Sequence, residues 1–153
     1  MTFSELNGEQ QHTSVSLSCY VSLMGVLGIG VDIVHVPRII RLLERRTPTR
    51  LAHRILSEKE LSAWNELPSE YEARRIRYLA VRWSVKEAAY KAIYPAARPT
   101  WKDFTFHSLS SDGSRKPFLE CHLRTRESSL WKFHASVSHD GDYVFATVIV
   151  EAP

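Results

Sequence analysis

The spacing of hydrophobic residues changes from helical to alternating near the middle of the chain. Between 37 and 93, hydrophobic side chains recur every three or four residues, whereas beyond Pro99 they alternate with polar ones. The alternating part contains two predicted hairpins: FTFHSL with PFLECHL around Asp112-Gly113, and WKFHASVS with YVFATVIV around Asp140-Gly141. Helices followed by hairpins, without repeated βα units, predict an α+β fold on an antiparallel sheet rather than a doubly wound fold.

Two segments precede the long helical region. GVLGIGVDIV at 25–34 is rich in β-branched residues and punctuated by glycine, which predicts a buried strand that another element approaches closely. A helix over 37–46 is predicted to begin at Pro37. Its apolar residues face inward and its basic residues face outward, namely Ile39, Leu42 and Leu43 against Arg38, Arg41, Arg45 and Arg46.

A long helix is predicted from about Ser69 to Ile93. Ser69 with Glu72 forms a capping box at its start, and Pro95 follows its end. Ser57 with Glu60 forms a second box that marks the start of a shorter helix. One stripe of the long helix carries Ile76, Ala80, Trp83, Glu87 and Tyr90.

Composition favours a single domain. The chain has 153 residues, of which 44% are hydrophobic, so we expect one domain over 25–153 after a flexible extension over 1–24. No apolar run reaches 18 residues, which argues against a membrane span. Cys19 and Cys121 form no disulfide framework or zinc motif, which fits a reducing compartment.

Positive charge is confined to the region after the first strand. All 20 Lys and Arg residues lie at or beyond Arg38, and 17 acids less the three at Glu5, Glu9 and Asp32 leave 14, so residues 38–153 carry a net +6. This predicts an acidic partner, which could be a protein, a nucleic acid or a phosphorylated small molecule.

Two carboxylates stand in apolar surroundings, Asp32 in the strand and Glu87 on the helical stripe. An exposed Glu87–Lys91 pair is the ordinary interpretation, because residues four apart on a helix commonly form such pairs. Burial of both acids would be costly without a cation or hydrogen bonds, and carboxylate oxygens are the ligands that Mg²⁺ prefers. If the strand packs on the helix, both acids could bind one Mg²⁺ beside a phosphate, with Lys91 neutralising charge on a leaving group.

Other motifs carry little weight. GIG at 28–30 lacks the third glycine of a dinucleotide loop. The histidines show no paired metal spacing, and Ser138–His139 lacks a nucleophile elbow. The basic helix could bind nucleic acid, although the aromatic platform that commonly accompanies such binding is missing.

The segments GIGVDIV, RWSVKEAAYKA and SVSHDGDYVFATVIVE, taken in order, resemble the 4′-phosphopantetheinyl transferases, and more narrowly their short holo-[acyl-carrier-protein] synthase type. The resemblance covers about Val26 to Glu151 and implies that family's fold, a long central helix packed on an antiparallel sheet. It also implies transfer of 4′-phosphopantetheine from coenzyme A to a serine of an apo acyl carrier protein, with Mg²⁺ as cofactor and adenosine 3′,5′-bisphosphate as product.

The resemblance also assigns roles to residues of this chain. Asp32 and Glu87 would bind the metal, Glu87 would take the serine proton directly or through water, and Lys91 would stabilise the diphosphate. Lys86 and His139 would contact the coenzyme. Val34 stands where larger members of the superfamily have another acid, which implies two protein carboxylates around the metal.

The basic helix would dock on the acidic helix of the carrier protein, through Arg38, Arg45 and Arg46 with Leu42 as an apolar contact. Neither membrane nor nucleic acid is expected as a partner. Short bacterial members are trimers, whereas the first 24 residues and YPAARPTWKDF look more like mitochondrial relatives, so the trimer and a mitochondrial or cytoplasmic location both stay open. The alternative function is a non-catalytic module that binds carrier proteins or nucleic acid.

Overall fold

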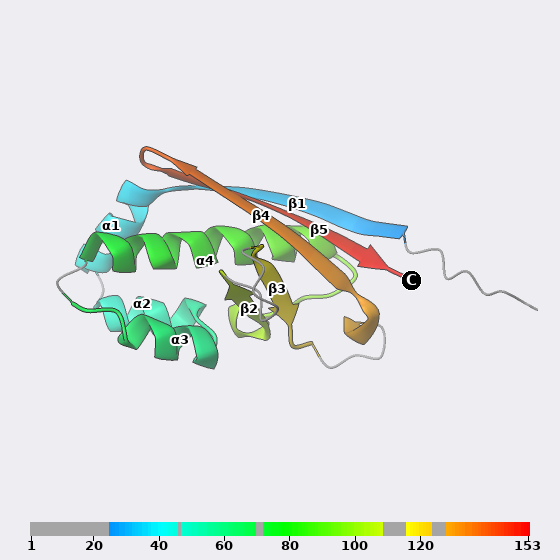
Figure 1. Ribbon diagram of the computed structural model, residues 1–153, viewed down its shortest axis with the longest axis horizontal. Coiled ribbons are helices and arrows are strands. Elements are labelled where there is room, and N and C mark those ends of the chain that lie inside the picture. The colour runs from blue at the N-terminus through cyan, green and yellow to red at the C-terminus, as the bar shows by residue number, and fades with distance from the viewer. Residues whose placement is uncertain (1–24, 46, 70–71, 109–115, 124–127) are drawn as a thin grey trace, which may run out of the picture.

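The computed structural model describes residues 25–45, 47–69, 72–108, 116–123 and 128–153. A long helix, α4 (Glu72–Ile93), lies between a three-stranded sheet and a layer made of short helices and a two-stranded sheet (Figure 1). The α+β class and the central helix are therefore confirmed. The predicted flexible extension over 1–24 lies outside the described residues.

The three-stranded sheet is antiparallel throughout. It is formed by β1 (Gly25–His35), β4 (Lys132–Asp140) and β5 (Tyr143–Ala152), in the order β1-β5-β4. Gly141 joins the last two strands and has a φ of 50°, which glycine adopts without steric cost. The second predicted hairpin is therefore confirmed. The strand order also places the first strand, β1, beside the last, β5.

Helix α1 (Val36–Arg45) follows β1 at the end of the sheet and packs beside the start of α4, and α2 (Pro48–Ile55) and α3 (Glu58–Asn65) then lie in the opposite layer (Figure 1). The strands β2 (Phe104–His107) and β3 (Phe118–Cys121) pair as predicted, while their turn at Asp112-Gly113 lies outside the described residues. Two short 3-10 helices, η1 (Trp101–Asp103) and η2 (Ser128–Leu130), precede β2 and β4. Sequence patterns did not predict α2, which has only eight residues.

Capping explains one helix start in this layer. The Ser57 hydroxyl accepts from the Glu60 amide, and the Glu60 carboxylate accepts from the Ser57 amide, so the first capping box is confirmed at α3. Helix α4 begins at Glu72. The predicted Ser69 box depends on residues 70–71, which are outside the described part of the chain.

Helix α4 is buried far more widely than one stripe. Its central position explains this, because β1 and β5 cover one side while α2, α3 and β2 cover the other (Figure 1). The predicted stripe was therefore too narrow. The buried residues, which include polar and charged ones, are Ile76, Leu79, Ala80, Arg82, Ser84, Val85, Lys86, Ala88, Ala89, Ala92 and Ile93.

Strand β1 is buried on one face only, so the prediction of a buried strand holds for its inner face and is wrong for its outer face. Gly28, Gly30 and Val34 turn toward α4, but the other face of β1 is open, with Ile29 60% and Ile33 61% exposed. Tyr143 and Phe145 of β5 extend this apolar face. In the described part of the chain, every helix is too short or too polar to cross a membrane.

Candidate active site

Glycine brings β1 close to α4. A side chain at Gly28 would collide with the backbone carbonyl of Ala92, and one at Gly30 with the carbonyl of Ala88. Because the strand has no side chains at these two positions, its backbone packs directly on the helix. The prediction of a close approach is confirmed, and this contact sets the place of the next inward residue, Asp32.

Only one of the two oxygens of the Asp32 carboxylate has a hydrogen-bond partner among the described residues. Its Oδ1 accepts a hydrogen bond from Lys91 Nζ at 2.9 Å, and Lys91 Nζ also donates to the Val31 carbonyl at 3.1 Å. Its Oδ2 is buried and has no hydrogen-bond partner among the described residues. A buried oxygen without a donor is costly, so this atom is positioned for a ligand that the protein does not itself supply.

Glu87 lies on the part of α4 that Asp32 faces. The Asp32 backbone carbonyl accepts from Ser84 Oγ at 3.2 Å, while its side chain contacts Lys91. Ser84, Glu87 and Lys91 follow one another at three- and four-residue spacing, so they share one helix face. Lys91 pairs with Asp32, and within the described ranges Glu87 makes no hydrogen bond or ion pair. The structure thus gathers Asp32, Glu87 and Lys91, while the predicted surface pair between Glu87 and Lys91 does not form.

A cavity of about 170 Å³ opens beside Glu87. Helix α4 forms one wall and the segment leading into β2 forms the other, with Trp101 packed against Trp83 at a ring separation of 5.2 Å. The cavity is mostly apolar with one carboxylate at its edge, which suits a flexible ligand arm whose reacting end is polar. Its lining residues are Lys86, Glu87, Tyr90, Pro99, Thr100, Trp101 and Phe104.

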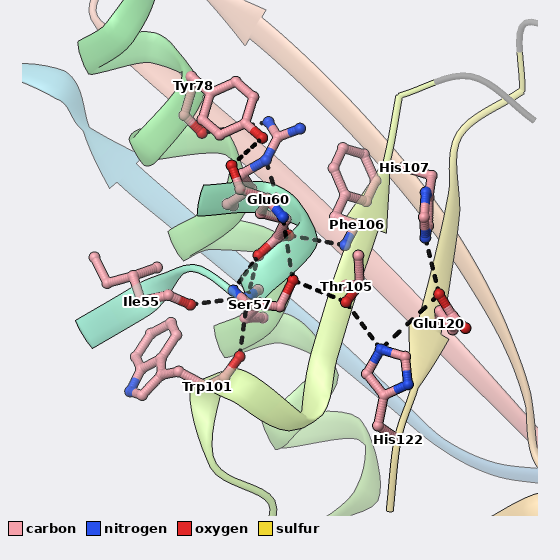
Figure 2. Close-up of polar contacts among 12 residues, drawn as sticks. Ile55, Ser57, Glu60, Tyr78, Trp101, Thr105, Phe106, His107, Glu120 and His122 are labelled. Carbon is pink, nitrogen blue, oxygen red and sulfur yellow. Dashed lines mark hydrogen bonds and ion pairs between the residues drawn. The ribbon is translucent and has the colours of Figure 1, made fainter. Parts of the chain in front are cut away.

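Lys86 is 1% exposed, and its ammonium donates all three of its hydrogens to protein groups. These are Glu60 Oε2 at 2.5 Å, the Ile55 carbonyl at 2.8 Å and the Trp101 carbonyl at 2.9 Å (Figure 2). Burial lowers the pKa of Lys86, and the neighbouring Glu60 carboxylate opposes that shift. The predicted coenzyme contact would find no unused donor on this ammonium.

Sequence reasoning missed the central place of Glu60. The carboxylate is 3% exposed and accepts from the backbone amides of Ser57 and Phe106, each at 2.8 Å, as well as from Lys86 (Figure 2). Arg82 approaches it at 3.8 Å, stacked on the Tyr78 ring, and burial lowers the pKa of that guanidinium. The capping pattern located Glu60, but a capping glutamate is commonly exposed, so its burial gave no signal in the sequence.

His139 lies apart from the carboxylates. It pairs across the sheet with Val144, which pairs with Val34, whereas Asp32 shares its row with Ala146 and Val137. His139 is exposed on β4, two strands from β1. A contact between His139 and the coenzyme therefore stays a prediction.

Helix α1 presents its charges as predicted. Arg38 and Arg45 are exposed and Ile39 is buried, while Leu42 is half-buried against the core. Arg46 lies outside the described residues. The basic face is accessible, and whether it binds a carrier protein stays a prediction.

Comparisons with known proteins agree with this arrangement. The family model of the 4′-phosphopantetheinyl transferase superfamily matches residues 28–148. The chain is 38% identical over 134 residues to a holo-[acyl-carrier-protein] synthase of Polaromonas sp., covering 82% of this chain and 96% of that protein. It is also 38% identical over 132 residues to one of Serratia proteamaculans, covering 84% and 99%.

Solved structures show the same fold. The holo-[acyl-carrier-protein] synthase of Neisseria meningitidis has a TM-score of 0.66 at 27% identity, over 82% of this chain and 98% of its own. The Bacillus anthracis enzyme, solved in complex with CoA (3′,5′-ADP), has a TM-score of 0.64 at 26% identity, over 85% and 99%. A Plasmodium yoelii holo-ACP-synthase reaches 0.70 at 20% identity, over 85% and 98%, and supports the fold alone.

Proposed function

The chain belongs to the 4′-phosphopantetheinyl transferase superfamily, and from that premise we propose which of its residues perform the transfer. As a holo-[acyl-carrier-protein] synthase it transfers the 4′-phosphopantetheine group from coenzyme A to a serine of an apo acyl carrier protein. The observation that carries the residue assignment is the half-satisfied Asp32 carboxylate facing the turn that bears Glu87 and Lys91.

Asp32 and Glu87 fit a Mg²⁺ ion, because Asp32 bonds Ser84 and Lys91 on either side of Glu87 along one helix face, and the buried Asp32 Oδ2 has no partner among the described residues. When bound, the ion would neutralise charge on the diphosphate of coenzyme A. The described residues contain no cluster of three or more His, Cys, Asp or Glu suited to a metal. Water and the diphosphate would complete the proposed coordination.

Glu87 is the proposed base. The carrier serine gives its proton to Glu87, directly or through one water, while its oxygen forms a bond to the phosphorus that bears the pantetheine arm. The bond from that phosphorus to the bridging oxygen breaks, and its electron pair leaves on adenosine 3′,5′-bisphosphate. Lys91, whose side chain is 46% exposed, turns from Asp32 toward the diphosphate and stabilises the developing charge.

The cavity beside Glu87 is the proposed place for part of the pantetheine arm. Its aromatic wall at Trp101 and Phe104 suits an uncharged chain, and Glu87 stands at its edge. His139 is proposed to contact the coenzyme at the more distant adenosine end. Lys86, which lines the cavity, would then hold its walls through the three protein groups that it bonds rather than donate to the ligand.

The exposed face of α1 is the proposed docking surface for the carrier protein. Arg38 and Arg45 are exposed there, and a net +6 over residues 38–153 favours an acidic partner. We also propose that the open apolar face of β1 and β5 is covered by further copies of the chain in a trimer. Light scattering at three times the 17.6 kDa of one chain would support the trimer, and a monomer mass would contradict it.

One incubation separates this enzyme from a non-catalytic carrier-binding or nucleic-acid-binding module. The full chain is mixed with Mg²⁺, coenzyme A and an apo carrier protein, and the carrier is weighed by mass spectrometry. We expect a gain of one phosphopantetheine that is absent with EDTA. No gain with fatty-acid, polyketide or aminoadipate carriers would contradict the function, and a gain that survives EDTA would contradict the metal.

A further inference from the structure

Glu60 connects elements from three parts of the chain. Its two carboxylate oxygens accept from Ser57 at the start of α3, from Phe106 on β2, and from Lys86 on α4 (Figure 2). An α3 cap alone would need only the Ser57 contact. The additional contacts and the 3% exposure indicate a role beyond capping.

Lys86 carries this connection to the cavity. Its ammonium joins the Glu60 carboxylate to the carbonyls of Ile55, at the end of α2, and Trp101, on η1. Lys86, Glu87 and Trp101 all line the cavity proposed for the pantetheine arm. The hydrogen bond from Lys86 to Trp101 therefore holds the two walls of that cavity together, one residue away from the proposed base.

We propose that Glu60 is a positioning residue for the transfer, acting through Lys86 to fix the Trp101 wall of the cavity against Glu87. This inference rests on the proposed function, because that function places the pantetheine arm in the cavity. Without the Glu60 carboxylate, the buried ammonium would lose the one acidic partner that it has among the described residues, and its hold on the two carbonyls would change. A shift of about 1 Å in such a wall can lower turnover about a hundredfold.

The test compares single and paired replacements in the full chain. Glu60→Gln keeps the shape and removes the charge, while Glu60→Gln with Lys86→Met removes both charges of this pair and can restore stability, because neither member is left buried without the other. Arg82, which lies 3.8 Å from Glu60, loses the same carboxylate in both variants. Ile76→Ala is the control for destabilisation alone. It is buried on α4, eleven residues before Glu87 and roughly 16 Å along the helix axis.

The readouts are kcat and the KM for carrier protein, measured well below each unfolding midpoint, with circular dichroism reporting the folded fraction. We expect kcat to fall at least about tenfold in Glu60→Gln and to stay low in the double variant even where stability returns. The carrier KM stays within twofold, and Ile76→Ala keeps the kcat of the unchanged chain.

Two results would overturn the inference. One is a kcat within twofold of the unchanged chain in folded Glu60→Gln. The other, which decides the matter if Glu60→Gln does not fold, is a double variant whose kcat recovers together with its stability. The unchanged chain is assayed first, so absence of any carrier modification would count against the proposed function and not against Glu60 alone.

Discussion

Two carboxylate–lysine pairs join α4 to its neighbours. They have the same chemical groups but differ in burial and in how many of their hydrogen-bonding atoms have partners. Glu60 with Lys86 is sealed in the interior, and all three ammonium hydrogens are used. Asp32 with Lys91 lies at the edge of the protein, where the lysine is 46% exposed and one aspartate oxygen has no partner in the described structure. The lysines are only five residues apart in KEAAYK.

Unused hydrogen-bonding capacity distinguishes a reactive pair from a structural one. A pair whose donors and acceptors are all satisfied gains nothing from a ligand and loses much when it is broken. A pair with an unused buried oxygen and a lysine that can move in solvent is poised to exchange partners. Saturation of hydrogen bonds, rather than the presence of charge, therefore separates the scaffold from the proposed chemistry.

The largest expected contrast is in stability. Lys86→Met leaves the Glu60 carboxylate buried without its closest cation and should lower the free energy of unfolding by about 3–5 kcal/mol. Lys91→Ala removes a partly exposed pair and should cost less than about 1 kcal/mol. Urea denaturation of both variants measures the free energy of unfolding. Equal decreases in the two variants would contradict the distinction between a structural pair and a reactive pair.

The next contrast is in rate. Glu87→Gln removes the proposed base from a half-buried side chain that has no ionic partner among the described residues, so folding should change little. Carrier modification should slow on the order of a hundredfold, as expected when a general base is removed. Mass spectrometry of the carrier protein in quenched samples gives the rate. A rate within threefold of that of the unchanged chain would contradict the proposal that Glu87 is the base.

A smaller effect is expected at the docking surface, which lies outside both pairs. Arg38→Ala and Arg45→Ala should each raise the KM for carrier protein several-fold at low salt, with less effect at high salt, while leaving the coenzyme KM unchanged. Arg41→Ala, on the same helix, is the matched comparison because its Nε already bonds the Pro37 carbonyl. Parallel losses for carrier and coenzyme would contradict the assignment.

The smallest effect concerns a third carboxylate at the surface. A hydrogen bond from His107 lowers the pKa of Glu120, and Lys59 adds to that shift. Because the folded pKa lies below the ordinary value of 4.5, the resulting stability is present above that pH and is lost as the pH falls through the folded pKa. Glu120→Gln should flatten this acid-side loss slightly in a pH series of thermal melts, and an unchanged series would show that the contact adds nothing.

Some of this architecture was predictable because it depends on local pattern. The alternation in 131–150 and the turn at Asp140-Gly141 predicted a hairpin that the structure contains, and glycine at 28 and 30 predicted a close approach by another element, which the structure identifies as α4. The order β1-β5-β4 was not predictable, since pairing of the first strand with the last depends on long-range packing.

The residues of the site also differ in whether local sequence was enough to identify them. Asp32 was recognisable because an acid inside an apolar strand is a local anomaly, whereas the sequence marked Glu60 only as a helix cap and Lys86 only as a coenzyme contact implied by the resemblance. Only the fold shows that they meet, across 26 residues of chain, in the interior. The open outer face of β1 was missed for the related reason that an apolar sequence does not show what covers it.

The proposed site depends on the Asp32 carboxylate, whose unpartnered oxygen would hold the Mg²⁺ ion that the transfer requires. The direct measurement is the initial rate of carrier mass gain against Mg²⁺ concentration, for the unchanged chain and for Asp32→Asn. We predict a saturating curve for the unchanged chain, and for Asp32→Asn a curve displaced to at least about tenfold higher Mg²⁺ with a lower plateau. Superimposable curves for the two proteins would contradict a metal-binding role for Asp32.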